Sequence, residues 1–188
     1  MTRKFNSDLR AEIGTLFPDN AIGAITPAVL RQFAADLIDS LRPTSTYYSR
    51  TGVPLPVALT TTPQKLIIFD EVTNGETTEL EGTIVGNAVT VNNSNGLLEM
   101  EADVEVEGAN SRELTLHLYK NGLATGKTVT SNLEGAGNPI VIPAQEKDIP
   151  LVVGDVFELW ASVDSNDTVT FNTGSNWFSR LITSRNPV

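Results

Sequence analysis

The sequence contains no cysteine and a single histidine, His117, among its 188 residues. Without cysteine the chain forms no disulfide, no thiolate metal site and no cysteine nucleophile, and one histidine excludes any site that needs two. Basic residues are also scarce, since 13 Lys and Arg stand against 23 Asp and Glu and leave a net charge of −10. An acidic chain repels nucleic-acid phosphates, so we expect no nucleic-acid partner.

Long apolar runs are absent as well. No stretch reaches the roughly 18 apolar residues that a membrane-spanning helix needs. The charged residues 1–4 are not followed by the apolar stretch that a secretory signal requires. We therefore expect no membrane partner, and synthesis in the cytoplasm. The length suits one domain with a short appendage.

Catalytic motifs are missing too. The sequence has no Gly-x-Ser-x-Gly elbow, no phosphate-binding loop and no His-Glu-x-x-His pair. Residues 122–128 end like a phosphate loop, but the first glycine stands one residue too close and no helix pattern follows, so we interpret them as strand and turn. We interpret His117 as a structural or surface histidine without a catalytic role. The sequence therefore predicts no catalytic, cofactor-binding or metal-binding residues, and we expect that the protein is not an enzyme.

The first 43 residues differ from the rest in net charge and in the periodicity of their apolar residues. Their charges cancel, so the whole net charge of −10 belongs to residues 44–188. Thr26 and Pro27 form a helix start, and Pro43 ends the helix. Between them a stripe of apolar residues recurs at helical spacing: Leu30, Phe33, Ala34, Leu37, Ile38 and Leu41.

This helix is too short to be stable alone in water, so its stripe must pack on something. The candidates are the shorter helix predicted around residues 7–17, the neighbouring domain, copies of the same helix, or a partner protein. We predict that residues 1–43 are a helical anchor that docks or oligomerises. Prolines at positions 43, 54, 56 and 63 predict a semi-rigid linker over residues 44–63.

From about residue 57 onward the pattern is that of β-strands. Apolar and polar residues alternate over 113–119 and 156–163, and residues 66–69 form a short apolar run. Asn-Gly pairs at 74–75, 95–96 and 121–122 favour tight hairpin turns. Many short strands without interleaved helices predict a mainly β fold, a sandwich or jelly roll over residues 57–188.

The most unusual stretch is the acidic segment 98–107. Alternation places its apolar residues on one face of a strand and five carboxylates on the other, namely Glu99, Glu101, Asp103, Glu105 and Glu107. A Ca²⁺ ion needs several converging oxygens, and a flat strand converges them poorly. We favour a solvated or salt-bridged face, with a Ca²⁺ site as the alternative.

The end of the chain resembles a family of jelly rolls. Residues 149–159 are similar to the segment in which a leucine and a Gly-Asp pair precede an alternating strand in the complement globular head and tumour necrosis factor family. Residues 177–182 look like the closing strand, and residues 96–98 and 114–122 look like two earlier strands. The resemblance implies a jelly roll over about residues 57–183, a homotrimer, and Arg180 beside the acidic segment; this superfold hosts many functions.

The front of the chain resembles a segment of tailed-bacteriophage virion proteins. Residues 17–31, followed by Phe33 and residues 36–40, are similar to an amino-terminal segment that recurs in head fibres, capsid decoration proteins and fibre-like appendages. That segment usually attaches a trimeric distal domain to the particle. The resemblance implies a location on the virion surface, with the major capsid protein or another virion protein as partner.

These patterns lead to one hypothesis and several alternatives. The leading hypothesis is a non-enzymatic virion structural protein, a trimeric capsid decoration (cement) protein or head fibre mounted by its amino-terminal helices. The alternative is a tail-fibre or baseplate receptor-binding protein, followed by a secreted trimeric binding module. A polysaccharide depolymerase needs two carboxyl groups facing each other across a cleft, which a uniformly acidic strand face does not supply.

Overall fold

The structure, a computed structural model, describes residues 30, 31, 34, 45–75, 80–92, 96–109 and 111–182. By its internal contacts the chain divides into two units, Met1–Pro43 and Thr44–Val188. In the first unit the described residues Leu30, Arg31 and Ala34 have helical backbone and exposed side chains. The rest of the predicted anchor, including Phe33, Leu37, Ile38 and Leu41, lies outside the described residues. No helix among the described residues is long and apolar enough to cross a membrane.

The described part of the second unit is built from strands. In chain order these are β1 (Ser45–Ser49), β2 (Leu55–Leu59), β3 (Gln64–Lys65), β4 (Glu71–Asn74), β5 (Leu80–Thr83), β6 (Ala88–Val91), β7 (Gly96–Glu107), β8 (Glu113–Lys120), β9 (Leu123–Asn132), β10 (Ile140–Leu151), β11 (Val156–Val163), β12 (Asp167–Phe171) and β13 (Asn176–Ile182).

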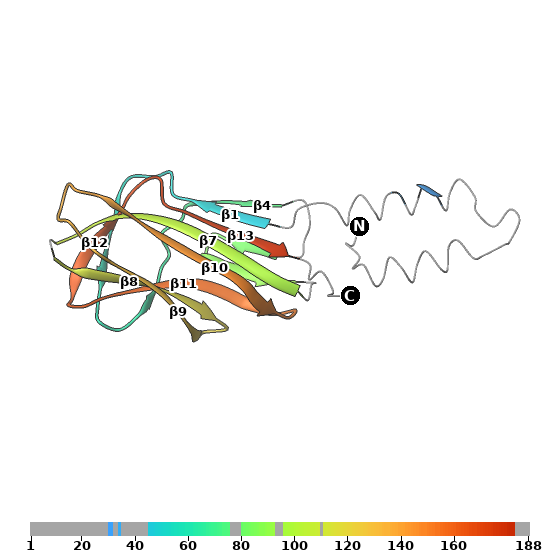
Figure 1. The fold of residues 1–188 in the computed structure, drawn as a ribbon. Coiled ribbons are helices and arrows are strands. Elements are labelled where there is room, and N and C mark those ends of the chain that lie inside the picture. Colours follow the sequence, from blue (N-terminus) through green and yellow to red (C-terminus); the bar gives the residue numbers. More distant parts are fainter. Residues whose placement is uncertain are drawn as a thin grey trace, which may run out of the picture. The chain divides into compact units, whose positions relative to one another are not determined.

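The strands form two antiparallel sheets that pack face to face (Figure 1). Sheet A has the order β2-β12-β7-β13-β1-β4. β10 also pairs with β7, on the side of β7 opposite β13. Sheet B has the order β5-β6-β11-β8-β9, with β3 also beside β11. The prediction of a mainly β fold is confirmed, and the two sheets are consistent with a jelly-roll sandwich.

The core lies between the sheets because alternate residues of each strand face inward. On β8 the buried residues are Leu114, Leu116 and Leu118, and on β11 they begin with Phe157 and Leu159, as the alternation in the sequence predicted.

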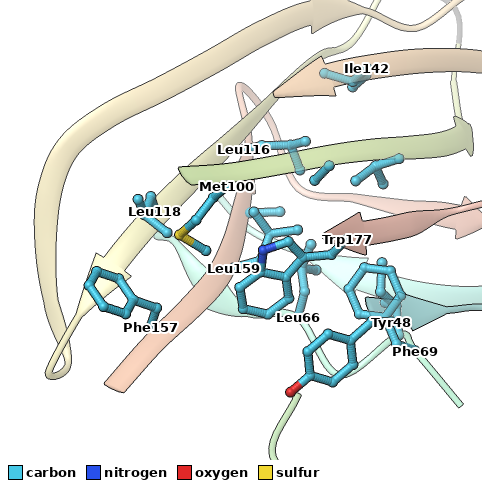
Figure 2. Packing of buried hydrophobic residues seen from close by; sticks show 14 of the residues in the cluster. Tyr48, Leu66, Phe69, Met100, Leu116, Leu118, Ile142, Phe157, Leu159 and Trp177 are labelled. Atoms are coloured by element: carbon cyan, nitrogen blue, oxygen red, sulfur yellow. The ribbon is translucent and has the colours of Figure 1, made fainter. Parts of the chain in front are cut away.

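An aromatic cluster fills the space between β1, β13 and sheet B (Figure 2). Tyr48 stacks on Trp177 with ring centroids 5.0 Å apart, and Phe69 is tilted against both. The Tyr48 hydroxyl donates to the Ala88 carbonyl at 2.6 Å and accepts from the Thr83 amide at 2.8 Å. Burial raises the pKa of Tyr48, so this hydroxyl stays protonated and joins the two sheets.

The predicted linker over residues 44–63 is wrong in part, because β1 and β2 lie inside it. β1 occupies an interior position between β13 and β4, so the sheet begins at Ser45 rather than near residue 57. Among the described strands β2 pairs with β12 alone, and an edge strand tolerates a proline such as Pro56. Residues 66–69 also differ from the predicted apolar strand. Leu66, Ile68 and Phe69 are buried, but strand β3 ends before them, at Lys65.

The turn between β8 and β9 agrees with the sequence. Asn121 and Gly122 have φ angles of 54° and 74°, which is the left-handed pair that a tight hairpin needs. The strand that follows, β9, includes residues 123–128. The interpretation of the phosphate-loop-like segment as turn and strand is therefore confirmed.

Candidate interaction surface

The solvent-facing side of sheet A carries Arg180 and the carboxylates of the acidic segment. We call this side the outer A face. It is formed by residues whose strand neighbours point into the core, and its central members are Tyr47 on β1, Phe178 and Arg180 on β13, Glu99 and Glu101 on β7, and Gln145 on β10.

An aromatic pair lies across the middle of the outer A face. Tyr47 and Phe178 are register partners on β1 and β13, and Phe178 is in turn the partner of Glu101 on β7. Tyr47 is 43% exposed, and Phe178 is partly exposed. Two adjacent aromatic side chains on the solvent side of a sheet form an apolar strip that a protein partner can bury.

Glu99 is the carboxylate of β7 that meets cations. It pairs in register with Arg180, whose Nε and Nη2 atoms both donate to Oε2 of Glu99. Lys147 Nζ lies 3.2 Å from Oε1 of the same carboxylate. The hydrogen bond from Arg180 is the main cause that holds the pKa of Glu99 below its ordinary value. The expected pairing of Arg180 with the acidic segment is confirmed.

No pattern in the sequence pointed to Lys147 as a partner of the acidic segment. The register between β10 and β7 shifts between Glu146 and Ile149, and Asp148 inside this irregularity has a φ of 55°. Before this shift the register pairs Gln145 with Glu101 and Glu146 with Met100, and its continuation by one residue puts Lys147 opposite Glu99. The pairing of β10 with β7 therefore places the Lys147 ammonium beside Glu99 on the same side of the sheet.

The other carboxylates of β7 are less enclosed. Glu101 is exposed, and Asp103, Glu105 and Glu107 are partly exposed. Glu107 Oε2 accepts a hydrogen bond from the Gly137 amide at 2.8 Å. Within the described ranges no group of three or more His, Asp or Glu side chains is arranged to hold a metal ion. The geometry is that of a partly salt-bridged strand face.

His117 lies on the opposite side of the sandwich, on the solvent side of sheet B. Its Nε2 is 2.8 Å from the Ser162 hydroxyl, which is a hydrogen bond between β8 and β11. Burial lowers the pKa of His117, so the ring is neutral at pH 7. This contact ties two neighbouring strands together.

A small cavity opens between the sheets where the edge strands β9 and β10 face each other. Its volume is about 30 Å³, room for about one or two water molecules. Core side chains such as Met100, Leu116 and Trp177 line it, and at its rim Lys127 pairs with Glu146 at 3.1 Å. A space this small and apolar is a packing defect of the core.

No protein-family model matches the chain, and no curated protein matches it in sequence. Solved structures match its fold. Eiger, a TNF of S. frugiperda, superposes with a TM-score of 0.53 at 10% identity, over 78% of this chain and 98% of that one. Murine APRIL, solved at pH 5.0, gives a TM-score of 0.54 at 8% identity, over 75% and 100%.

These likenesses concern the fold alone, because the sequence identities are very low. Neither of the two structures named above is that of a virion protein. The β unit of this chain is therefore similar in fold to the jelly rolls of tumour-necrosis-factor proteins.

Proposed function

We propose that this protein is a non-enzymatic virion structural protein, a capsid decoration (cement) protein or head fibre. In this proposal it assembles as a homotrimer through the outer A face. Residues 1–43 mount it on the surface of a bacteriophage particle by binding the major capsid protein or another virion protein.

The outer A face is the observation that carries the assembly part. It presents the aromatic pair Tyr47 and Phe178, and the carboxylate of Glu99 is already neutralised by Arg180 and Lys147. A face of this kind is buried at lower cost than one with unpaired charges. The jelly-roll family that the sequence resembles typically assembles as trimers, which supports a three-fold arrangement.

The distribution of charge supports the proposed attachment of the protein to the particle through residues 1–43. The first 43 residues carry no net charge and hold the apolar stripe, whereas the β unit carries the whole net charge of −10. A strongly charged outer domain stays soluble on a crowded particle surface. A neutral, amphipathic segment is suited to bind another protein through its apolar side.

The assembly part is tested by light scattering on the purified chain. We expect a mass three times that of the 20.2 kDa chain. The variant Tyr47→Glu introduces a charge into the centre of the outer A face and should give a folded monomer. Thr128→Glu, on the exposed edge strand β9 of sheet B, is the matched control and should stay trimeric. A wild-type monomer at micromolar concentration contradicts the proposal.

Electron microscopy of the intact particle tests the location. A decoration protein or head fibre should be found on the head at a copy number that matches the shell symmetry. A few copies on the tail, together with free protein that blocks adsorption to the host, would instead indicate the receptor-binding alternative. Absence from purified particles contradicts both and favours a secreted binding module.

A further inference from the structure

The solvent side of sheet B carries a pair of stacked aromatic rings. Tyr119 on β8 and Trp160 on β11 have ring centroids 4.1 Å apart and planes inclined by 9°. Both side chains are partly exposed. Tyr119 pairs in register with Ala124 at the start of β9, so the small neighbour leaves the tyrosine ring uncovered on that side.

Polar side chains lie around this pair of rings, and they form hydrogen bonds with one another or with Trp160. Trp160 Nε1 donates to Glu158 Oε2 at 3.1 Å, and Lys65 Nζ binds Oε1 of the same carboxylate. His117 and Ser162 are joined next to Trp160 along the two strands. We call these six side chains the aromatic platform: Lys65, His117, Tyr119, Glu158, Trp160 and Ser162.

The aromatic platform is close to electrically neutral on a strongly acidic chain. Its charged groups, Lys65 and Glu158, form an ion pair with each other. Towards β9 the same side of the sheet continues with the hydrogen-bonded hydroxyls of Thr115 and Thr130, 2.9 Å apart. The Tyr119 hydroxyl makes no hydrogen bond to another described residue, and the ring rather than this hydroxyl is the group that we expect to contact a ligand.

We propose that the aromatic platform binds a neutral hexose-containing glycan. The C–H groups on one side of a hexose ring pack on an aromatic ring, and the sugar hydroxyls bind carboxylate, imidazole and hydroxyl groups around it. A neutral sugar avoids the repulsion that the net charge of −10 imposes on acidic glycans and nucleic acids. A peptide that adds a strand finds no free edge here, because β8 and β11 are interior strands.

This inference does not depend on the trimer or on the particle, because the platform and the outer A face lie on different sheets. Failure of one proposal therefore leaves the other standing. Loss of the trimer in Tyr47→Glu should not change glycan binding, and loss of glycan binding in a platform variant should not change the mass of the assembly.

Tryptophan fluorescence of the full-length protein provides the test. The chain has two tryptophans, and Trp177 is 1% exposed inside the core, so a change on titration reports Trp160. The probes are oligosaccharides of glucose, galactose and mannose, with uronic-acid oligosaccharides for comparison. We expect a saturable change with at least one neutral oligosaccharide and none with the acidic ones.

Two variants of one residue separate the ring from its hydroxyl. Tyr119→Ala should weaken binding by about tenfold or more, which is about 1.4 kcal/mol, whereas Tyr119→Phe keeps the ring and should bind within a few-fold of wild type. Circular dichroism and the melting temperature establish that each variant is folded. Absence of saturable binding by the wild-type protein to every neutral oligosaccharide overturns the proposal, and so does unchanged affinity in a folded Tyr119→Ala.

Discussion

Arg180 is the residue on which the acidic strand depends most directly. It binds the nearly buried Glu99 carboxylate, which is 7% exposed, with two donor atoms. We predict that Arg180→Ala lowers the melting temperature by a few degrees, because the carboxylate keeps only Lys147 as a partner. The loss should shrink as salt screens the pair. Thermal melts in low and high salt measure both effects, and an unchanged melting temperature in low salt contradicts the prediction.

Asp155 is a second enclosed carboxylate and fixes the loop before β11. Burial alone would raise its pKa, but hydrogen bonds from Lys120, the Val152 amide and Asn121 outweigh that effect and hold the pKa below its ordinary value of 3.8. Lys120 also lies over the Phe157 ring, with Nζ 5.7 Å from the centroid. Asp155 therefore joins the β8–β9 turn to the β10–β11 turn.

We predict that Asp155→Asn lowers the free energy of unfolding by about 2 kcal/mol, because it removes a charged acceptor from three donors. A depressed carboxyl pKa stabilises the fold above the pKa of the unfolded chain, and this contribution is lost as pH falls below it. The variant should therefore lose less stability than wild type between pH 5 and about pH 3. Urea unfolding at several pH values measures this, with the exposed Asp164→Asn as the control that should change little.

At the scale of elements, the β8–β9 hairpin depends on its turn. Gly122 has a φ of 74°, and a Cβ at this position would meet no atom within 4 Å. We predict that Gly122→Ala costs about 1 kcal/mol through backbone strain alone. Gly86→Ala is the matched control, since Gly86 lies in another turn without positive φ and should change stability little. Equal effects of the two substitutions in urea unfolding would contradict this account.

The next prediction concerns β7 and whether its acidic face needs a bound metal ion for stability. Its carboxylates are spread along a strand, and one of them is neutralised by Arg180 and Lys147. We predict that a chelator leaves the melting temperature unchanged. A clear drop on chelation, restored by added Ca²⁺, would support the metal alternative.

At the scale of the whole molecule, the two units should be separable. All strands of the described residues and their core belong to Thr44–Val188. We predict that deletion of residues 1–43 leaves a soluble, folded β unit that no longer binds particles. Circular dichroism and binding to particles that lack the protein check both parts. Full occupancy by the truncated chain would show that the β unit itself makes the contact.

The sequence by itself determined the elements whose alternation is long and regular. Leu114, Leu116 and Leu118 on β8 are buried as their spacing predicted, and the five carboxylates of β7 lie on the side away from the core. The pairing of Arg180 with Glu99 followed once the closing strand was placed beside that segment. These features could be predicted because burial of one strand face imposes a period of two on the residues.

Only the tertiary structure decided the contacts that a local pattern does not encode. Residues 45–49 read as part of a linker, yet they form an interior strand because β13 and β4 supply hydrogen-bonding partners on both edges. Lys147 reaches Glu99 because β10 pairs with β7, and the stack of Tyr119 on Trp160 joins residues from two strands. A jelly roll places distant segments side by side, so such pairs depend on which strands the topology brings together.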